Sequence, residues 1–199
     1  MHTKNTNDKF MNRYRNGSAR LQKWDYGWNA SYFITICTYD RKLFFGNISD
    51  CVMILNDIGQ IAKKFWFEIP NHFEFVELGA FVVMPNHIHG IIIINKTDDH
   101  CRDKAMPDNR RDKALPCPYG DDVVDTDKTI GQSRFRNPGK NNISSIIGSY
   151  KSVVTKHSRL INPEFAWQSR FYDHIIRDDK SFKNISKYID DNPAKWDFK

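Results

Sequence analysis

The sequence lacks a membrane-spanning segment and contains few cysteines. No stretch approaches the roughly 18 consecutive apolar residues that a transmembrane helix needs, and the polar first nine residues contain no apolar signal core. We therefore expect a cytoplasmic protein without a membrane partner. The cysteines form no Cys-x-x-Cys pair, so they indicate neither a zinc ribbon nor a disulfide framework, and we expect reduced thiols. They are Cys37, Cys51, Cys101 and Cys117.

The chain is long enough to bury one hydrophobic core, and nothing in it requires a second. With 199 residues, of which 40% are hydrophobic, we expect one domain over residues 1–199. The formal net charge of +6 suits a polyanionic partner. Basic residues gather in an N-terminal arm, residues 1–28, where they alternate with aromatic rings. This mixture is typical of a nucleic-acid-binding segment, and a solvated arm without a partner has the same composition.

The spacing of the apolar residues predicts an α+β domain. The expected strands are residues 31–39, 73–84, 87–95 and 171–177, with a tight turn at Pro85-Asn86 between the second and third. The expected helices are residues 50–69, closed by Pro70, then 142–161, and finally 181–191, capped by Asp178 or Ser181. Residues 96–140 are polar and repeat a short motif, Arg102 to Pro107, nine positions later. Such a stretch is typical of a flexible insertion.

Two histidines provide the first indication of chemistry. His87 and His89 open the expected strand that follows the Pro85-Asn86 turn. Because side chains alternate along a strand, both imidazoles should point to the same face, where they could share one metal ion. Their place at one end of a sheet favours a functional site. With seven histidines in the chain, a chance or purely structural pair is the alternative.

The last expected helix carries a second polar pair. Tyr188 and Asn192 are four residues apart, so a phenol and a carboxamide should lie on the same helix face. Taken alone, this pair has an ordinary explanation, because a tyrosine at the rim of a core and an asparagine before a proline are both common structural features.

Four sequence blocks together resemble the REP-associated tyrosine transposases, which belong to the HUH single-tyrosine transposases. One block contains Met84-Pro-Asn-His-Ile-His-Gly90, and another contains Tyr188-Ile-Asp-Asp-Asn-Pro193. The family signature is a His-hydrophobic-His pair with one nucleophilic tyrosine. The blocks span Tyr32–Thr38, Gly79–Ile94, Ile146–Thr155 and Trp167–Pro193. Only the extreme N-terminus and residues 96–140 fall outside the resemblance.

The resemblance implies a fold and a set of catalytic residues. The fold would be a central antiparallel sheet flanked by helices, ferredoxin-like in layout. His87 and His89 match the paired metal ligands, Asn192 matches the third ligand, and Tyr188 matches the nucleophile. Imidazole and carboxamide ligands with open positions suit Mg²⁺ or Mn²⁺. Tyrosine attack on a phosphodiester would give a 5′-phosphotyrosine and a free 3′-hydroxyl, which permits nicking and strand transfer without ATP.

The resemblance also implies single-stranded or hairpin DNA as the partner, and leaves both a homodimer and a monomer open. Candidate DNA contacts are basic residues near the ends of expected elements. They are Arg13, Arg15, Arg20, Lys23, Arg41, Lys42, Lys151, Lys156 and Arg177. His174 is a candidate accessory group for proton transfer or phosphate binding. Tyr150, the other tyrosine on an expected helix, lies on an apolar stripe and is expected to be core.

Two other functions use the same residues differently. In a non-catalytic nucleic-acid-binding protein with a ferredoxin-like fold, the histidines would be incidental and exposed rings would stack on bases. In a metal-dependent phosphodiesterase, the histidine pair would activate water in place of the tyrosine. A protein–DNA covalent adduct distinguishes the transposase reaction from both.

Overall fold

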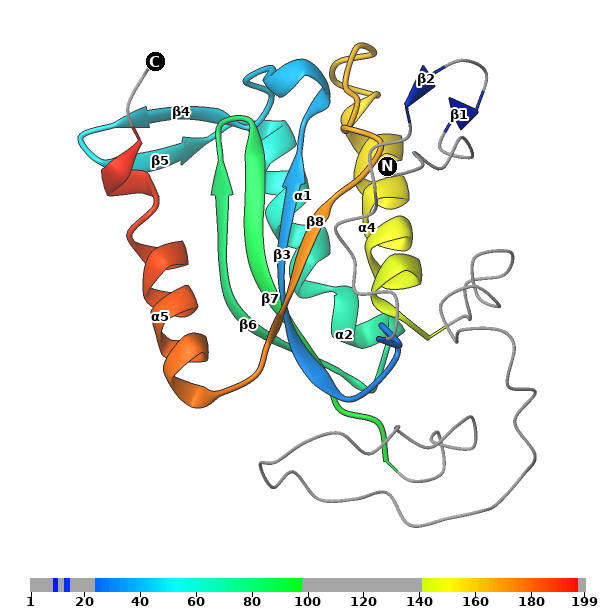
Figure 1. The fold of residues 1–199 in the computed structure, drawn as a ribbon. Helices are drawn as coiled ribbons and strands as arrows, with labels where there is room; N and C mark the ends of the chain where they lie inside the picture. The colour runs from blue at the N-terminus through cyan, green and yellow to red at the C-terminus, as the bar shows by residue number, and fades with distance from the viewer. Residues whose placement is uncertain (1–8, 11–12, 15–23, 98–140, 197–199) are drawn as a thin grey trace, which may run out of the picture.

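The core of the protein is a four-stranded antiparallel sheet with helices on both faces. A computed structural model describes residues 9–10, 13–14, 24–97 and 141–196 (Figure 1). Most of the basic arm and nearly all of the expected insertion lie outside these residues. Within the described part of the chain, no helix has the length and apolar character needed to cross a membrane.

The sheet has the ferredoxin-like topology that the family resemblance implies. In spatial order its strands are β6 (Val76–Met84), β7 (His87–Ile94), β3 (Ala30–Cys37) and β8 (Tyr172–Ile176). Each neighbouring pair is antiparallel. One helix, α1 (Asp57–Phe67), connects β3 to β6, and α4 (Ile143–Ser158) connects β7 to β8. The resulting βαββαβ order places β7 and β3 in the interior of the sheet.

Strands β3 and β7 form because they are rich in β-branched residues that fit a pleated, buried surface. They pair along their whole length, so that Thr35 lies opposite His89 and Cys37 opposite His87. The two-residue turn at Pro85-Asn86 leads directly from β6 into β7, as expected. Because side chains alternate along each strand, these strands contribute to two different faces of the sheet.

The helices α1 and α4 cover one face and bury the main hydrophobic core there (Figure 1). Fully buried Ile34 and Ile88 point to this face and pack with Trp66 from α1 and Ile146 from α4. Helix α4 begins where the sequence predicts, because Asn142 caps it in a reciprocal capping box with the third helical residue. This core supplies most of the buried apolar surface of the domain.

The helix α5 (Asp179–Asp190) lies on the opposite face (Figure 1). Its first turn is capped by Asp178, one of the two expected caps, whose side chain accepts a hydrogen bond from the Ser181 backbone N–H. Here the buried cluster is small, with Ile91 and Ile176 from the sheet packing against Ile189 from the helix. A short 3₁₀ helix, η4 (Pro193–Lys195), follows.

The expected helix over residues 50–69 is wrong in its first third. Instead of a helix, its first residues form the turn and the second strand, β5 (Val52–Leu55), of a hairpin with β4 (Gly46–Ser49), and α1 begins at Asp57. The apolar residues of 52–55 fit a helical pattern, but Asn56 adopts an extended backbone and its side chain caps α1. Asp50 and Cys51 both have positive φ, at 51° and 63°, as a tight hairpin turn of this kind requires.

Some short elements were not expected from the sequence. Pro70 does not end the chain's helical path, because it lies in the first turn of the short helix α2 (Ile69–His72), a position that proline tolerates. The strand β1 (Lys9–Phe10) pairs with β2 (Arg13–Tyr14). A 3₁₀ turn, η2 (Tyr39–Arg41), follows β3.

Candidate functional site

The two histidines of β7 lie on the sheet face that α5 covers. Their alternation with Ile88 places both rings on this face, as the sequence predicts. The two Nε2 atoms are 3.1 Å apart, so the imidazoles converge on one point. Neither ring is freely exposed, and His89 is only 6% exposed. The pair is therefore a preformed group at one end of an interior strand.

The other nitrogen of each imidazole has a hydrogen-bond partner. His87 Nδ1 lies 2.7 Å from Asn86 Oδ1, and His89 Nδ1 lies 2.8 Å from Thr35 Oγ1. If each Nδ1–H donates to its oxygen, both Nε2 atoms carry lone pairs that face one another. Such outer partners orient metal-binding histidines and fix their tautomers. In that tautomer, Asn86 and Thr35 hold the rings in the form that binds a metal.

Burial favours the neutral state of both imidazoles. It lowers the pKa of His87 to about 4, and the positive charge of Arg41 acts in the same direction. Burial lowers the pKa of His89 to about 3, with a further contribution from His87. At neutral pH both rings are therefore uncharged, as metal ligands must be.

Tyr188 of α5 lies beside this pair in the same chain. Its ring centroid is 5.5 Å from that of His89. Phe33 of β3 lies beneath both residues, stacked on His89 at 5.3 Å and edge-on to Tyr188 at 6.1 Å. The Tyr188 side chain is 47% exposed, so a large substrate can reach it. An exposed phenol held next to a buried imidazole pair is suited to attack on a substrate held there.

Asn192 follows in the turn between α5 and η4. Its Nδ2 donates to the Tyr188 backbone carbonyl at 3.1 Å, which leaves the side-chain oxygen directed elsewhere. Four residues further on, the Trp196 ring is 5.8 Å from the ring of His87. Asn192 therefore belongs to a segment whose two ends contact the two histidines.

The residues present fit a divalent metal ion. Two neutral imidazoles with converging Nε2 atoms direct two nitrogen donors toward one point. Among the described residues, no group of three or more His, Cys, Asp or Glu side chains is arranged to hold a metal. The donor set here contains only two residues of those types, so it has a low charge and would leave coordination positions for a substrate.

The other predicted site residues lie at different distances from the pair. Arg41 is near enough to influence His87. Lys42 forms an exposed 3.6 Å ion pair with Glu164. His174 is on β8 opposite Phe33, on the same face as the pair. Arg177 follows the end of β8 that is remote from the pair.

The remaining predicted residues divide into two groups. Lys151 and Lys156 are on α4, on the other side of the sheet. Arg15, Arg20, Lys23 and the side chain of Arg13 lie outside the described residues. Cys37 and Cys51 are free thiols, as expected, whereas Cys101 and Cys117 lie outside. Tyr150 is buried and its hydroxyl donates to the Ala62 carbonyl, which confirms its role in the core.

Several residues of the site were not identified from the sequence. Asn86 directly precedes His87, so its position was a usable signal. Thr35, Phe33 and Trp196 are distant in sequence, and only the strand register and the path of α5 bring them to the histidines. A single sequence carries no signal for such contacts.

Comparison with known proteins gives one family relative. An uncharacterized protein of Haemophilus influenzae is 37% identical over 182 residues, covering 90% of this chain and 89% of that protein. No protein-family model matches the chain. The relative extends over most of the described elements and carries no stated activity.

Solved structures give the fold. A REP-associated tyrosine transposase bound to a REP hairpin aligns with a TM-score of 0.53 and 20% identity, covering 91% of this chain and 74% of that chain. A candidate transposase from Deinococcus radiodurans aligns at 12% identity with a TM-score of 0.41, covering 88% and 95% of the two chains. The first alignment confirms, at the level of the fold, the resemblance that the sequence blocks indicate.

Proposed function

Because the chain belongs to the family of the Haemophilus influenzae protein and has the fold of a REP-associated tyrosine transposase, we propose that it nicks and rejoins single-stranded DNA. One observation carries the proposal. Tyr188 lies against His89, whose Nε2 converges with that of His87, within one chain. In the proposed reaction, the nucleophile and the metal-binding pair would therefore both come from one chain.

The histidine pair and Asn192 would hold the metal ion, Mg²⁺ or Mn²⁺. When bound, the ion would supply positive charge next to the non-bridging oxygens of the scissile phosphate. The chain's own contribution is to keep the imidazoles neutral and aligned, through burial and through the hydrogen bonds of Asn86 and Thr35. Arg41, whose charge reaches His87, adds positive potential at the same end of the sheet.

Tyr188 would attack the scissile phosphorus. The bond between its Oη and phosphorus forms while the bond between phosphorus and the 3′-oxygen breaks. The phenol loses its proton and the departing 3′-oxygen gains one, which leaves a 5′-phosphotyrosine and a free 3′-hydroxyl. Attack by another 3′-hydroxyl reverses the step and joins strands. Phe33 would orient the phenol, since it contacts both Tyr188 and His89.

A single-stranded substrate suits this geometry. One tyrosine on a helix must reach one phosphate in line, and a stacked duplex would obstruct it. The structural neighbour is bound to a REP hairpin, which supports a hairpin-forming DNA as the substrate of this chain. Basic residues near the site and on α4 would then contact phosphates and supply affinity.

A covalent-trapping experiment tests the proposal. Purified protein and Mn²⁺ are incubated with hairpin oligonucleotides that carry a single-stranded flank and a label on either side of the expected nick. Denaturing gels should show label attached to the protein in the wild type and none in Tyr188→Phe. Tyr172→Phe is the matched control, because Tyr172 is also exposed, at 52%, and also contacts Phe33 edge-on.

Each other outcome identifies a different function. Cleavage without a protein adduct, retained in Tyr188→Phe, would establish a hydrolase that activates water. Binding without cleavage at any Mn²⁺ or Mg²⁺ concentration would establish a non-catalytic binding protein. An adduct that persists in Tyr188→Phe and disappears in Tyr172→Phe would show that Tyr172, and not Tyr188, is the nucleophile.

A further inference from the structure

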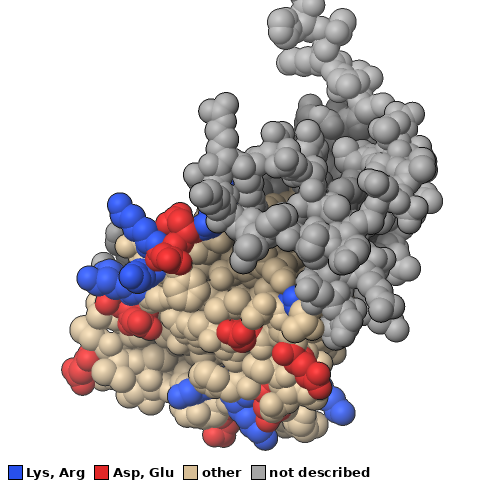
Figure 2. Space-filling view, turned by 90° about the horizontal axis from the view of Figure 1, so that it is seen from below, with Lys and Arg blue, Asp and Glu red and all other residues tan. Residues whose placement is uncertain are grey.

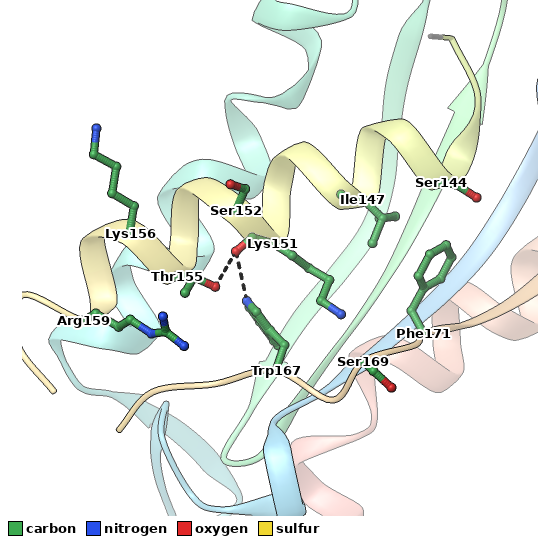
Figure 3. A pocket seen from close by; sticks show the side chains of 11 residues that line it. Ser144, Ile147, Lys151, Ser152, Thr155, Lys156, Arg159, Trp167, Ser169 and Phe171 are labelled. Carbon is green, nitrogen blue, oxygen red and sulfur yellow. Dashed lines mark hydrogen bonds between the residues drawn. The ribbon is translucent and has the colours of Figure 1, made fainter. Parts of the chain in front are cut away.

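A groove runs along α4 on the side of the sheet away from the histidine pair. Its volume is about 620 Å³, and it lies between α4 and the segment from Trp167 to Phe171 that leads into β8 (Figure 3). The α4 residues that line it recur every three or four positions, from Ser144 to Arg159. The groove therefore follows one face of the helix over most of its length.

All the charged residues that line the groove are basic. Lys151, Lys156 and Arg159 line it, together with the hydroxyl groups of serine and threonine side chains, and no carboxylate is among its lining residues, all of which are described. In Figure 3, Lys151 and Arg159 extend toward the Trp167–Phe171 segment, whereas Lys156 extends away from it. The face in Figure 2 differs, because acidic and basic side chains are interspersed there.

Lys151 is the innermost cation. Its Nζ donates to the Gln168 carbonyl at 2.6 Å, and partial burial lowers the pKa of its ammonium group. A half-buried cation whose surroundings contain hydroxyls and no carboxylate is stabilised by an anion. The absence of acidic residues from the lining of the groove therefore favours a negatively charged ligand.

Gly148 in the middle of α4 gives an independent indication of a ligand. Glycine is among the least favourable residues within a helix, and a Cβ at this position would meet no atom within 4 Å. Packing within the described residues therefore does not require glycine here. A glycine that leaves the helix backbone open is typical of a surface that another molecule approaches closely.

The Trp167 ring, which lines the groove, is packed against the core. The Trp167 Nε1 donates to the Lys151 carbonyl, and its ring packs against Phe165 and Phe45 of the core. The groove therefore presents mainly cations and hydroxyl groups to a ligand. From Lys151 to Arg159 they extend over about 12 Å of helix, a length that spans several phosphates of one DNA strand.

The segment that forms one wall of the groove leads directly to the face of the sheet that carries Tyr188. The Trp167–Phe171 segment continues directly into Tyr172, which starts β8 and contacts Phe33 on the histidine face. Because β8 is the edge strand of the sheet, no further strand of the sheet separates the groove from that face. A DNA molecule lying in the groove can send a strand around this edge toward Tyr188.

We propose that the α4 groove binds the sugar–phosphate backbone of the double-stranded stem of the DNA hairpin, while the single-stranded flank reaches Tyr188. This inference rests on the proposed function. It assigns affinity for the stem to one face of the sheet and cleavage of the flank to the other. Phosphate contacts of this kind position a duplex without reading its sequence.

Substitution of Gly148 tests the groove without removing any existing contact. Gly148→Glu introduces a negative charge into open space, and Gly148→Gln is its neutral counterpart of the same size. Fluorescence anisotropy with a labelled hairpin should show roughly tenfold weaker binding for Gly148→Glu than for Gly148→Gln at 0.1 M salt. Lys156→Glu, compared with Lys156→Gln, is a second exposed pair and should give the same order.

The salt dependence and a stemless DNA sharpen the result. Lys156→Gln removes one cation that would contact a phosphate. It should therefore lower the magnitude of the slope of log K against log salt by about one, relative to the wild type. Adduct formation on a short single-stranded oligonucleotide without a stem should be unchanged in Gly148→Glu. Equal hairpin affinity and equal salt slope in the Glu and Gln variants at both positions would overturn the proposal.

The two proposals fail in different ways. If the nicking function is wrong, no adduct forms on any DNA, and the Gly148 and Lys156 pairs still report whether the stem occupies the groove. If the groove is wrong, Tyr188→Phe still abolishes the adduct while the α4 variants bind the hairpin like the wild type. A loss of adduct on stemless DNA in Gly148→Glu would also overturn the separation of the two faces.

Discussion

The two faces of the four-stranded sheet are built from alternate residues of the same strands, and they have different tasks. On one face, even-numbered residues of β3 and β7 such as Ile34 and Ile88 are completely buried under α1 and α4. On the other face, Thr35 and His89 form hydrogen bonds, and only a small apolar cluster packs under α5. The comparison indicates that stability comes mainly from one face, which frees the other for polar chemistry.

The histidine face should be important for activity and dispensable for folding. We expect His89→Gln to reduce adduct formation by roughly a thousandfold, a loss of about 4 kcal/mol of transition-state stabilisation. The thermal midpoint should change little, because His89 is already uncharged at neutral pH and Gln is a neutral side chain that can also hydrogen-bond. Single-turnover labelling and differential scanning calorimetry measure the two effects. If His89→Gln failed to fold, the result would contradict the assignment of stability to one face of the sheet and activity to the other.

The buried face should give the opposite result. Ile34→Ala removes a completely buried side chain and should lower the free energy of unfolding by about 2–5 kcal/mol. Urea denaturation measures this effect, with Val52→Ala as an exposed control. In conditions where the variant is folded, its adduct formation should stay within severalfold of the wild type. A large loss of activity in fully folded protein would show that the faces are coupled.

Thr35 is next to Ile34 in sequence and belongs to the histidine face. Thr35→Val keeps the shape of the side chain but removes the hydrogen-bonding oxygen 2.8 Å from His89 Nδ1. Loss of such an orienting partner typically costs about 10–100-fold in metal affinity. Isothermal titration with Mn²⁺ measures this effect, and Thr35→Ser, which retains a hydroxyl, is the control. Equal affinity in the valine and serine variants would exclude Thr35 as a positioning residue.

The smallest expected effect is on the pH dependence of the free energy of unfolding. Burial lowers the pKa of His87 to about 4 and of His89 to about 3, both below the ordinary value near 6.5. Between about pH 6.5 and pH 4, the unfolded chain binds protons that the folded chain does not. The free energy of unfolding of the metal-free protein should therefore fall as the pH falls through this window.

A double variant isolates this contribution. In His87→Gln/His89→Gln, the fall in the free energy of unfolding between pH 6.5 and pH 4 should be shallower than in the wild type. Urea denaturation at several pH values in the presence of a chelator measures both slopes. Identical slopes would show that the two imidazoles titrate alike in the folded and unfolded chains.

Most of the fold could be predicted from the sequence because the strands of the sheet and the helices α4 and α5 have strong periodicity and clear ends. The β-branched runs predicted the bounds of β3 and β7 to within two residues. Helix α4 begins near Asn142 and Asp178 caps α5, both as expected. The hairpin at β4 and β5 was missed, because its apolar residues fit a helical pattern equally well. Local spacing alone does not separate these two structures.

For this protein, the sequence by itself determined that His87 and His89 share a face and that Tyr188 and Asn192 share a helix end, since both follow from local periodicity. Only the tertiary structure decided that Tyr188 lies beside His89, that Thr35 and Phe33 contact His89, and that a basic groove occupies the other side of the sheet. The physical reason is the distance along the sequence over which each effect acts. Backbone periodicity acts over a few residues, whereas strand register and helix packing join residues that are about a hundred positions apart.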